Sequence, residues 1–366
     1  MSNEDIYKRR KEADNTNTPI SVLAKLSTDE NLGVRCAVAR NLNAPIEALV
    51  NLAGDEHAAV RCAVAKNSNT PAEVLAILVG DEDWRIREAV AGNPNAPAEV
   101  LNKLATDETF SVRLRVARNP NAPYEVLNRL AGDDAWYVRH EVAENPNSSA
   151  EVLAKLAGDK DWRIREAVAG NPNAPVELLT RLATYGDKNA PWFAVRNPSF
   201  PVEILERLAT DEDWEIRSAV AGNTSAPGEV LAKLAADENP YVREAMAGNP
   251  SAPGEVLAKL AADENPYVRE AMAGNPSAPG EVLDRLARDK DWTVRGKVAR
   301  NTNAPTEALN KLAEDEDLGV LLEVARNPKI PPEVINDLCF SEERSIRQAL
   351  SENPAVPEHI RVGLSL

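Results

Sequence analysis

One asparagine recurs every 26 residues through almost the whole chain, and no other feature limits the possible folds as strongly. It occupies fourteen positions, which bound thirteen units: Asn15, Asn41, Asn67, Asn93, Asn119, Asn145, Asn171, Asn197, Asn223, Asn249, Asn275, Asn301, Asn327 and Asn353. A fixed period of this length is typical of a solenoid, in which one supersecondary unit stacks on copies of itself. We therefore expect one elongated domain over residues 15–352 of the 366-residue chain.

The first half of each unit has the pattern of a short helix. In residues 93–118, Pro97 suits the first helical turn, where its missing N–H is not needed. Val100, Leu101 and Leu104 then fall on one helical face. The pattern predicts a first helix with an aliphatic face directed toward the core.

The second half of the unit has the pattern of another helix. Asp107 is expected to cap its start. Val112 and Val116 lie four residues apart with Ala117 beside them, and these are expected to face the core. The sequence therefore predicts an all-α protein made of thirteen helix pairs.

The repeating asparagine is predicted to end the second helix. Asparagine tolerates the left-handed backbone that often ends a helix, and a following proline prevents continuation. Glycine adopts that backbone more easily, yet it never appears at this position. We therefore expect the side-chain amide to bond the backbone of the neighbouring unit.

An aspartate and an arginine recur six residues apart within a unit. The pairs are Asp29/Arg35, Asp55/Arg61, Asp81/Arg87, Asp107/Arg113, Asp133/Arg139, Asp159/Arg165, Asp211/Arg217, Asp237/Arg243, Asp263/Arg269 and Asp289/Arg295. In the seventh unit both are lost together, as Tyr185 and Pro191. Because a buried charge without a partner is costly, the joint loss predicts that the two residues of a pair bind each other.

The repeated motif LAxDxxxxVRxxVAxNPxxPxEVL resembles that of the leucine-rich repeat variant family, and the Asp–Arg spacing resembles the ladder of HEAT repeats. The resemblance covers nearly the whole chain and implies a right-handed superhelix of short helix pairs. The founding member of the variant family carries a cysteine-liganded iron–sulfur cluster before its repeats. Residues 1–14 contain no cysteine, so no cofactor is expected here.

The two ends are predicted to be caps rather than further domains. Residues 1–14 resemble half a unit, because Arg9 is in register with the repeating arginine. Residues 353–366 resemble a final first helix, and their apolar end suggests a monomer or weak end-to-end association. Such caps shield the core of a solenoid.

The charge of the chain bounds its partners and location. A net charge of −16 disfavours nucleic-acid binding and favours a basic partner. No apolar run approaches membrane-spanning length, and no signal peptide is visible. Cys36 and Cys62 hold the same position in adjacent units, about 9–10 Å apart if helices pack normally, which is too far for a disulfide. Free thiols fit a cytoplasmic location.

An aromatic column at the start of the second helices is the candidate binding surface. The candidates are Trp84, Phe110, Trp136, Tyr137, Trp162, Tyr185, Trp192, Phe193, Trp214, Tyr241, Tyr267 and Trp292. Aromatic residues are common anchors of interfaces, and in helix-pair solenoids the second helices commonly line the concave face. The alternative is that these rings only fill gaps between adjacent helices.

The seventh unit, residues 171–196, is the main irregularity. Pro191 is expected to break the usual second helix and to start a shorter one. Trp192 and Phe193 then occupy positions that elsewhere hold small or charged residues. They either fill the space left by the lost Asp–Arg pair or line an aromatic pocket.

The sequence gives no sign of an enzyme. His57, His140 and His359 lie in distant units and cannot converge on one metal or catalytic centre. The favoured function is a protein-interaction scaffold that binds a protein or peptide along the concave face. One alternative is a structural spacer without a specific ligand, which suits the identical residues 227–252 and 253–278. Another is a HEAT-like nucleic-acid-binding protein using Arg40, Lys66, Arg118, Arg196, Arg300 and Arg326.

Overall fold

The protein is built from pairs of short helices. The computed structural model describes residues 3–184 and 190–364, and every regular element in these ranges is an α-helix. The predicted all-α helical-repeat architecture is confirmed. The chain divides into two compact units, Met1–Leu182 and Ala183–Leu366, which are called the first and second unit below. The 26-residue units of the sequence are called repeats from here on. The boundary between them falls within the irregular residues 171–196.

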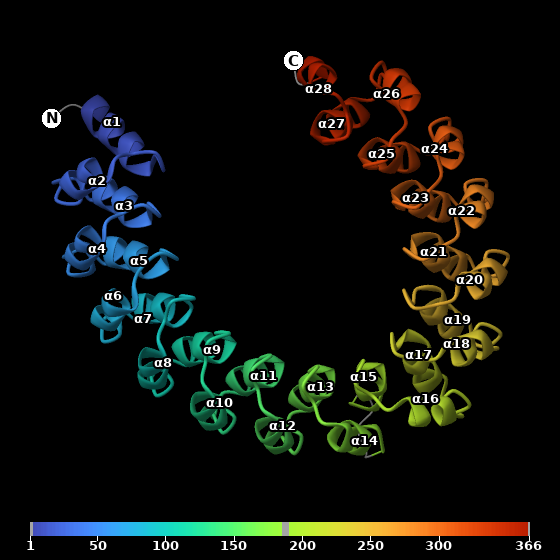
Figure 1. Cartoon of the computed structure of the whole chain (residues 1–366), viewed down its shortest axis with the longest axis horizontal. Coiled ribbons are helices and arrows are strands. Elements are labelled where there is room, and N and C mark those ends of the chain that lie inside the picture. The colour runs from blue at the N-terminus through green and yellow to red at the C-terminus, as the bar shows by residue number, and fades with distance from the viewer. Residues whose placement is uncertain (1–2, 185–189, 365–366) are drawn as a thin grey trace. The chain divides into compact units, whose positions relative to one another are not determined.

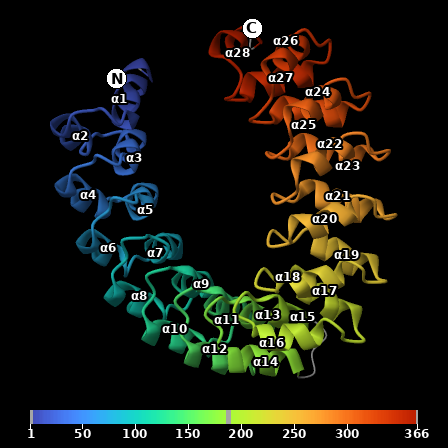
Figure 2. The same cartoon turned by 45° about the vertical axis from the view of Figure 1, so that its right-hand side comes forward.

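Each compact unit contains two rows of helices (Figures 1 and 2). In the first unit, the row of second helices is α1 (Asn3–Asp14), α3 (Leu32–Arg40), α5 (Ala58–Lys66), α7 (Trp84–Ala91), α9 (Phe110–Arg118), α11 (Trp136–Glu144) and α13 (Trp162–Gly170). The row of first helices is α2 (Ile20–Leu26), α4 (Ile46–Ala53), α6 (Ala72–Leu78), α8 (Ala98–Leu104), α10 (Tyr124–Leu130), α12 (Ala150–Leu156) and α14 (Val176–Thr184).

The second unit repeats this arrangement. Its second helices are α15 (Ala190–Arg196), α17 (Trp214–Gly222), α19 (Pro240–Ala247), α21 (Pro266–Gly274), α23 (Trp292–Arg300), α25 (Leu318–Arg326) and α27 (Arg344–Glu352). Its first helices are α16 (Val202–Leu208), α18 (Gly228–Leu234), α20 (Gly254–Leu260), α22 (Gly280–Leu286), α24 (Thr306–Leu312), α26 (Pro332–Leu338) and α28 (Glu358–Leu364). Of the described helices, none is both long enough and apolar enough to cross a membrane.

Side-chain size explains how the rows pack. The predicted core residues of the type unit are buried: Leu101 and Leu104 on α8, and Val112, Val116 and Ala117 on α9. Small Val and Ala side chains allow the second helices to approach one another closely, and they contact each other more extensively than the first helices do. Within each unit, the second helices therefore lie on the inner side of the bend and the first helices on the outer side (Figure 1).

The repeating asparagine joins each repeat to the preceding one. Asn145 is 3% exposed, and its Nδ2 donates to the carbonyl oxygens of Ala117 at 2.6 Å and Asn119 at 3.1 Å. Its Oδ1 accepts the N–H of Asn147 at 2.8 Å. The same three bonds recur at Asn41, Asn67, Asn93, Asn119, Asn171, Asn223, Asn249, Asn275, Asn301, Asn327 and Asn353. We call this set the asparagine ladder.

The predicted use of the amide is confirmed, but the predicted backbone conformation is wrong. Asn145 has φ −64° and ψ 126°, which is extended rather than left-handed. Its side chain needs this geometry in order to reach two carbonyl groups of the preceding repeat and one N–H of its own loop. Glycine has no amide and could make none of these bonds, which explains its absence from the position.

The repeating arginine joins each repeat to the following one. Arg61 Nε donates to Asp81 Oδ2 at 2.6 Å, and its Nη2 donates to Asp81 Oδ1 at 3.0 Å. The same two-pronged pair forms in Arg9–Asp29, Arg35–Asp55, Arg87–Asp107, Arg113–Asp133, Arg139–Asp159, Arg217–Asp237, Arg243–Asp263, Arg269–Asp289 and Arg295–Asp315. We call this set the arginine–aspartate ladder.

The predicted carboxylate partner within the same repeat is wrong. The residues that were expected to pair lie six positions apart, whereas the carboxylate that binds each arginine lies twenty positions further along. Arg61 does contact Asp55 of its own repeat, but through Nη1 and the backbone oxygen of Asp55 at 2.9 Å. The Arg61 side chain therefore crosses the boundary between repeats through Nε and Nη2, while its Nη1 binds the loop that precedes its own helix.

The ladder aspartates also differ from their predicted role as helix caps. Asp107 Oδ1 accepts the N–H of Thr109 at 2.9 Å, while the residue at the cap position of α9 is Thr109 itself. In several repeats the residue two positions after the ladder aspartate makes the capping bond. Asp83, for example, accepts the N–H of Arg85 at 2.9 Å at the start of α7. The loop before α7 thus uses two aspartates that lie two positions apart, Asp81 for the ladder and Asp83 for the helix.

The second helix of the irregular repeat is described from Ala190 onward, because residues 185–189 lie outside the described residues. Its described part, α15, has seven residues and includes Pro191. The predicted shortening of this helix concerns its start, which lies outside the described residues. An arginine at position 191 would donate hydrogen bonds to Asp211. Proline has no side-chain donor and cannot form this pair. Tyr185, which replaces the other member of the pair, lies outside the described residues.

Candidate interaction surface

The candidate aromatic residues start the second helices on the inner side of each unit. Trp84, Phe110, Trp136, Trp162, Trp214 and Trp292 are the first residues of α7, α9, α11, α13, α17 and α23. The residue before four of these helices is an aspartate whose side chain accepts the N–H two positions further on, at Asp83, Asp161, Asp213 and Asp291. This capping bond fixes the helix start and with it the position of the ring.

The rings in this column are not buried between helices. Trp84 and Trp214 are each 38% exposed, Trp162 is 46% exposed and Trp292 is 53% exposed. Phe110 is likewise half exposed, and Trp136 is less so. A ring that only filled a gap between helices would be covered, so the packing interpretation does not account for these exposures.

A stack of three rings from α9 and α11 is extended by an arginine from α13 in the first unit. The ring centroids of Trp136 and Tyr137 lie 3.8 Å apart, and Tyr137 lies 6.4 Å from Phe110. The guanidinium carbon of Arg163 lies 3.7 Å from the Trp136 centroid. Two groups this close cannot share one face of the indole, so Trp136 is held between Tyr137 and Arg163. The stack is therefore rigid, with an exposed edge.

An ion pair fixes the arginine of this stack. Arg163 Nη2 donates to Asp161 Oδ2 at 2.9 Å. The hydrogen bond to Asp161 raises the pKa of Arg163, and Asp161 has a pKa below its usual value for the same reason. The contact between Arg163 and Trp136 joins adjacent repeats and could not be predicted from the sequence, because it depends on the direction in which the arginine leaves its helix.

The second unit presents a looser row of rings. Trp214 and Tyr241 lie 5.2 Å apart, whereas Tyr241 and Tyr267 are 58% and 63% exposed. The ring of Trp292 lies against Gly319, where an added Cβ would stand 3.4 Å from its Cζ3. Within the described residues, Trp84, Trp162, Tyr267 and Trp292 contact no other aromatic ring. The column is thus a series of separate anchors with one continuous stack.

The irregular repeat contributes a separate aromatic pair. Trp192 and Phe193 pack edge to face on α15 with their centroids 4.8 Å apart, and both are half-buried. Arg196 lies 4.9 Å from the Trp192 ring. This pair packs largely against its own helix, which differs from the exposed column.

Acidic residues accompany the aromatic column. The loop before each second helix usually carries a glutamate after the ladder aspartate, and the side chains of Glu82, Glu108 and Glu238 are 92%, 88% and 92% exposed. They stand 3.5–3.9 Å from ladder arginines that are already bound to aspartates. Their charge therefore remains available to solvent or to a partner.

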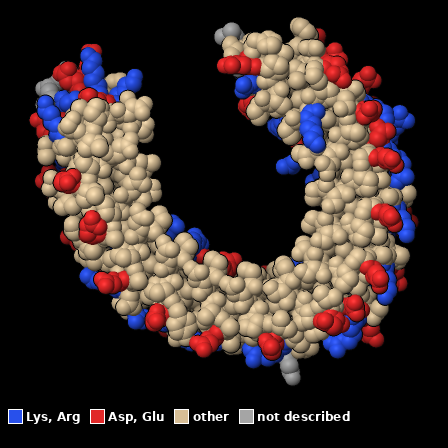
Figure 3. All heavy atoms as spheres, in the orientation of Figure 1, with Lys and Arg blue, Asp and Glu red and all other residues tan. Residues whose placement is uncertain are grey.

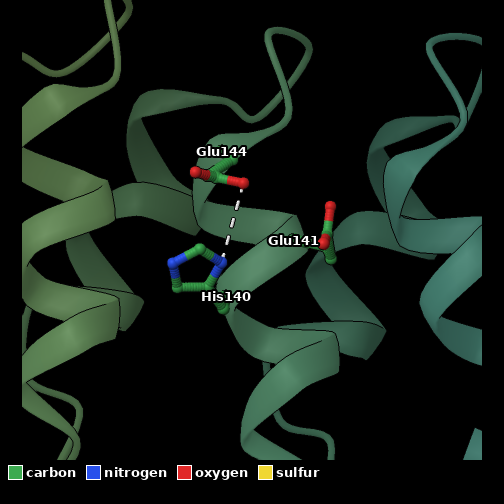
Figure 4. A group of neighbouring side chains, drawn as sticks. All are labelled: His140, Glu141 and Glu144. Carbon is green, nitrogen blue, oxygen red and sulfur yellow. Dashed lines mark ion pairs between the residues drawn. The ribbon is translucent and has the colours of Figure 1, made fainter.

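A histidine and two glutamates gather on α11, which sequence reasoning did not anticipate (Figure 4). His140 Nδ1 lies 3.6 Å from Glu144 Oε2, and the possible ligand atoms of His140, Glu141 and Glu144 lie within 4.8 Å of one another. The i,i+4 spacing of His140 and Glu144 was the available signal. Glu141 is bound by Arg118 of the preceding repeat, so its carboxylate is already neutralised.

Parts of the chain match known repeat families. A model described as leucine rich repeat variant matches residues 58–83 and 84–108, and a leucine rich repeat variant domain matches residues 138–192. A search of curated proteins gives no match. One similar solved structure is described as a leucine-rich repeat variant with a novel repetitive protein structural motif. It is 29% identical, and the match covers 60% of this chain and 87% of that chain at a TM-score of 0.37.

A second similar solved structure is that of Kap121p bound to Ste12p. It is 13% identical, and the match covers 100% of this chain and 53% of that chain at a TM-score of 0.39. The chain thus spans about half the length of this protein. The family matches at residues 58–108 and 138–192 confirm the predicted resemblance of the chain to the leucine-rich repeat variant family.

Proposed function

We propose that this protein is a non-enzymatic scaffold that binds another protein along the inner side of its second helices. The observation that carries the proposal is the exposure of the tryptophan column, with Trp162 and Trp292 about half exposed at regularly spaced helix starts. Exposed apolar surface is costly in water, and aromatic residues with arginine are the usual anchors of interfaces. A scaffold of stacked repeats keeps such anchors at fixed intervals.

The surroundings of the anchors support a basic partner. Exposed carboxylates such as Glu82, Glu108 and Glu238 precede the helices that carry or adjoin the aromatic column. A lysine or arginine of the partner can face an indole ring and a carboxylate together, which combines a cation–π contact with charge attraction. The net charge of −16 favours the approach of a basic partner from a distance.

The proposal is tested by comparing two triple variants. One replaces the exposed Trp162, Trp214 and Trp292 by alanine. The other replaces exposed apolar residues of the first helices, Ile77, Tyr124 and Val202, and so serves as a matched control. Proteins retained from a nuclease-treated lysate are identified for each chain and for the unaltered protein. We expect specific proteins to be retained by the unaltered chain and the control but lost from the tryptophan variant.

Other outcomes would assign a different role. If all three chains retain the same proteins, the tryptophan column is not the binding surface. If no chain retains any protein, the spacer interpretation is supported instead. If proteins are retained from untreated lysate but not from nuclease-treated lysate, the nucleic-acid interpretation is favoured.

A further inference from the structure

A cavity between α5, α7 and α9 carries an unusual concentration of positive charge. It has a volume of about 420 Å³ and is lined by Lys66, Arg85 and Arg115 together with one carboxylate, Glu88. Trp84 forms part of its wall, and Gly92 lies at the position where six other repeats carry a cation. Cations also project from the inner side of the first unit near α7 and α9 (Figure 3).

The second unit contains a cavity at the same place in the repeat, and its charged lining residues are Arg196 and Glu244. Six periods further along, a cavity of about 480 Å³ is lined by Ser218, Glu244 and Gly248 in place of Cys62, Glu88 and Gly92. Its lining also includes Gly222, Tyr241 and Ala271, which stand where the first cavity has Lys66, Arg85 and Arg115. The repeat thus produces the cavity, and three substitutions make the first one basic.

Arg115 is the clearest of these substitutions. Eight repeats have alanine at its position: Ala37, Ala63, Ala89, Ala167, Ala219, Ala245, Ala271 and Ala349. The core does not require an arginine there, because the helix forms equally well with alanine. Arg115 is 45% exposed in its side chain and donates from Nε to Glu88 Oε1 at 3.2 Å.

The charges of the cavity are only partly compensated. Glu88 neutralises one of the three cations. Asp83 forms an ion pair with Arg85 at 3.6 Å, although it does not itself line the cavity. Lys66 is exposed and has no ion-pair partner within the described residues. Three cations of the lining thus face one carboxylate within the cavity, and Lys66 is the cation without an ion pair among the described residues.

We propose that this cavity binds a phosphomonoester, carried on a phosphorylated side chain of the bound protein. A phosphomonoester has a charge of about −1.5 to −2 and three acceptor oxygens, so it offers one oxygen to each of the three cationic side chains of the lining, whereas a carboxylate has only two. Arginine and lysine are the usual donors to phosphate. The acidic remainder of the chain opposes a long polyanion, so a single phosphate on an otherwise basic partner fits the site.

The source of the phosphate rests on the proposed scaffold function, but the site itself is tested without a partner. The probe is phenyl phosphate, and phenyl sulfate provides a monoanion of nearly the same shape. The chain has six tryptophans, and their indole N–H signals in ¹⁵N-labelled protein report on separate places. Trp84 borders the basic cavity, and Trp214 borders its neutral counterpart.

We expect phenyl phosphate to shift the Trp84 signal with saturation and to leave the Trp214 signal in place. Arg115→Ala, which restores the residue of eight other repeats, and Lys66→Gln should each weaken binding by roughly tenfold, as expected for one charged hydrogen bond. Glu88→Gln should strengthen binding, because it releases Arg115. Phenyl sulfate should bind more weakly than phenyl phosphate.

Arg118→Ala is the matched control. Arg118 lies on the same helix as Arg115, is 53% exposed in its side chain and is bound to Glu141 outside the cavity. It should leave binding unchanged. The proposal is overturned if Trp84 does not respond, if Trp84 and Trp214 respond equally, or if Arg115→Ala has no more effect than Arg118→Ala. If phenyl phosphate binds saturably at Trp84 but the lysate experiment captures no protein, the phosphate site stands and its assignment to a protein partner is rejected.

Discussion

In each repeat, the side-chain amide of one asparagine makes several hydrogen bonds that a different side chain could not make. Asn145 satisfies two buried carbonyl groups of the preceding repeat and one N–H of its own loop. Asn145→Leu keeps a similar volume but removes all three bonds and leaves the carbonyl of Ala117 without its side-chain partner, while the carbonyl of Asn119 keeps only the N–H of Ala122. Because each buried polar group without a bond costs about 1–3 kcal/mol, the variant should lower the free energy of unfolding by roughly 2–4 kcal/mol.

Urea unfolding followed by circular dichroism measures this loss. Asn102→Leu is the control, because Asn102 is exposed on α8 and the same change there removes no buried bond. An unfolding midpoint for Asn145→Leu equal to that of the control would show that the ladder does not stabilise the chain.

The ladder aspartates make stability depend on acid pH. Burial is the largest single influence on Asp81 and raises its pKa, but the hydrogen bonds from Arg61 and from the N–H of Asp83, with the charge of Arg61, outweigh burial and leave the pKa below its ordinary value. The pKa is lowered in the same way at Asp55, Asp107, Asp159, Asp237, Asp263, Asp289 and Asp315.

These shifts set the pH range in which the protein loses stability. The folded-state pKa lies below the unfolded value of about 3.9, so the contribution is complete above that pH and is lost as the pH falls through the folded pKa. The urea midpoint should change little through these groups between about pH 7 and pH 5 and fall steeply below about pH 4. In Asp81→Asn the slope below pH 4 should be smaller, and an unchanged slope would contradict this account.

The sequence was sufficient to predict which residues form the two ladders, but not how they connect. The periodic Asn, and the joint replacement of the Asp and Arg of one repeat by Tyr185 and Pro191, indicated that these polar residues have partners. The carboxylate of Asp81 could be assigned to Arg61 rather than Arg87 only when the direction of the side chains was known, since every repeat offers the same choice of partners.

Among the elements, α15 is expected to be the least protected second helix. Pro191 stands where other repeats have the ladder arginine. A missing ladder contact lowers the free energy of local opening. Amide hydrogen exchange in α15 should be at least about tenfold faster than in α11 or α21, which retain Arg139–Asp159 and Arg269–Asp289.

Exchange is read by mass spectrometry on peptides that cover each helix. Equal protection of α15, α11 and α21 would show that the missing arginine has no energetic effect. The sequence predicted the missing contact, because proline stands in place of the arginine. It did not predict the stack of Trp136 with Arg163, because rotamers on neighbouring helices decide that contact.

At the scale of the whole molecule, stability should be close to a sum over repeats and their junctions. Residues 227–252 and 253–278 are identical, so deletion of residues 253–278 joins Ala252 to Pro279 through a junction whose residues already occur in the protein. The shortened chain should fold and keep its helical signal per residue. Its urea m-value should fall by about 7%, in proportion to the residues removed.

Deletion of residues 253–270 shifts the register and should greatly lower the urea midpoint. Equal midpoints for the in-register and out-of-register deletions would contradict the additive account.

The family resemblance and the repeat predicted the architecture of the molecule well, because both depend on a pattern copied many times. The candidate surface was predicted less completely. The aromatic column follows from the repeat, whereas the basic cavity depends on Arg115, which departs from the alanine of other repeats, and on neighbours brought together only by stacking.

The two ladders also make every junction between repeats directional, because its two sides carry different groups. Asparagine reaches back to the preceding repeat, whereas arginine reaches forward to the following one. A chain cut before α3 would present Asp29 without Arg9 and Asn41 without the carbonyl oxygen of Ala13. Such an end is complementary to the opposite end of another cut chain and not to its own kind. Chains truncated at both ends should therefore associate head to tail rather than as symmetric pairs.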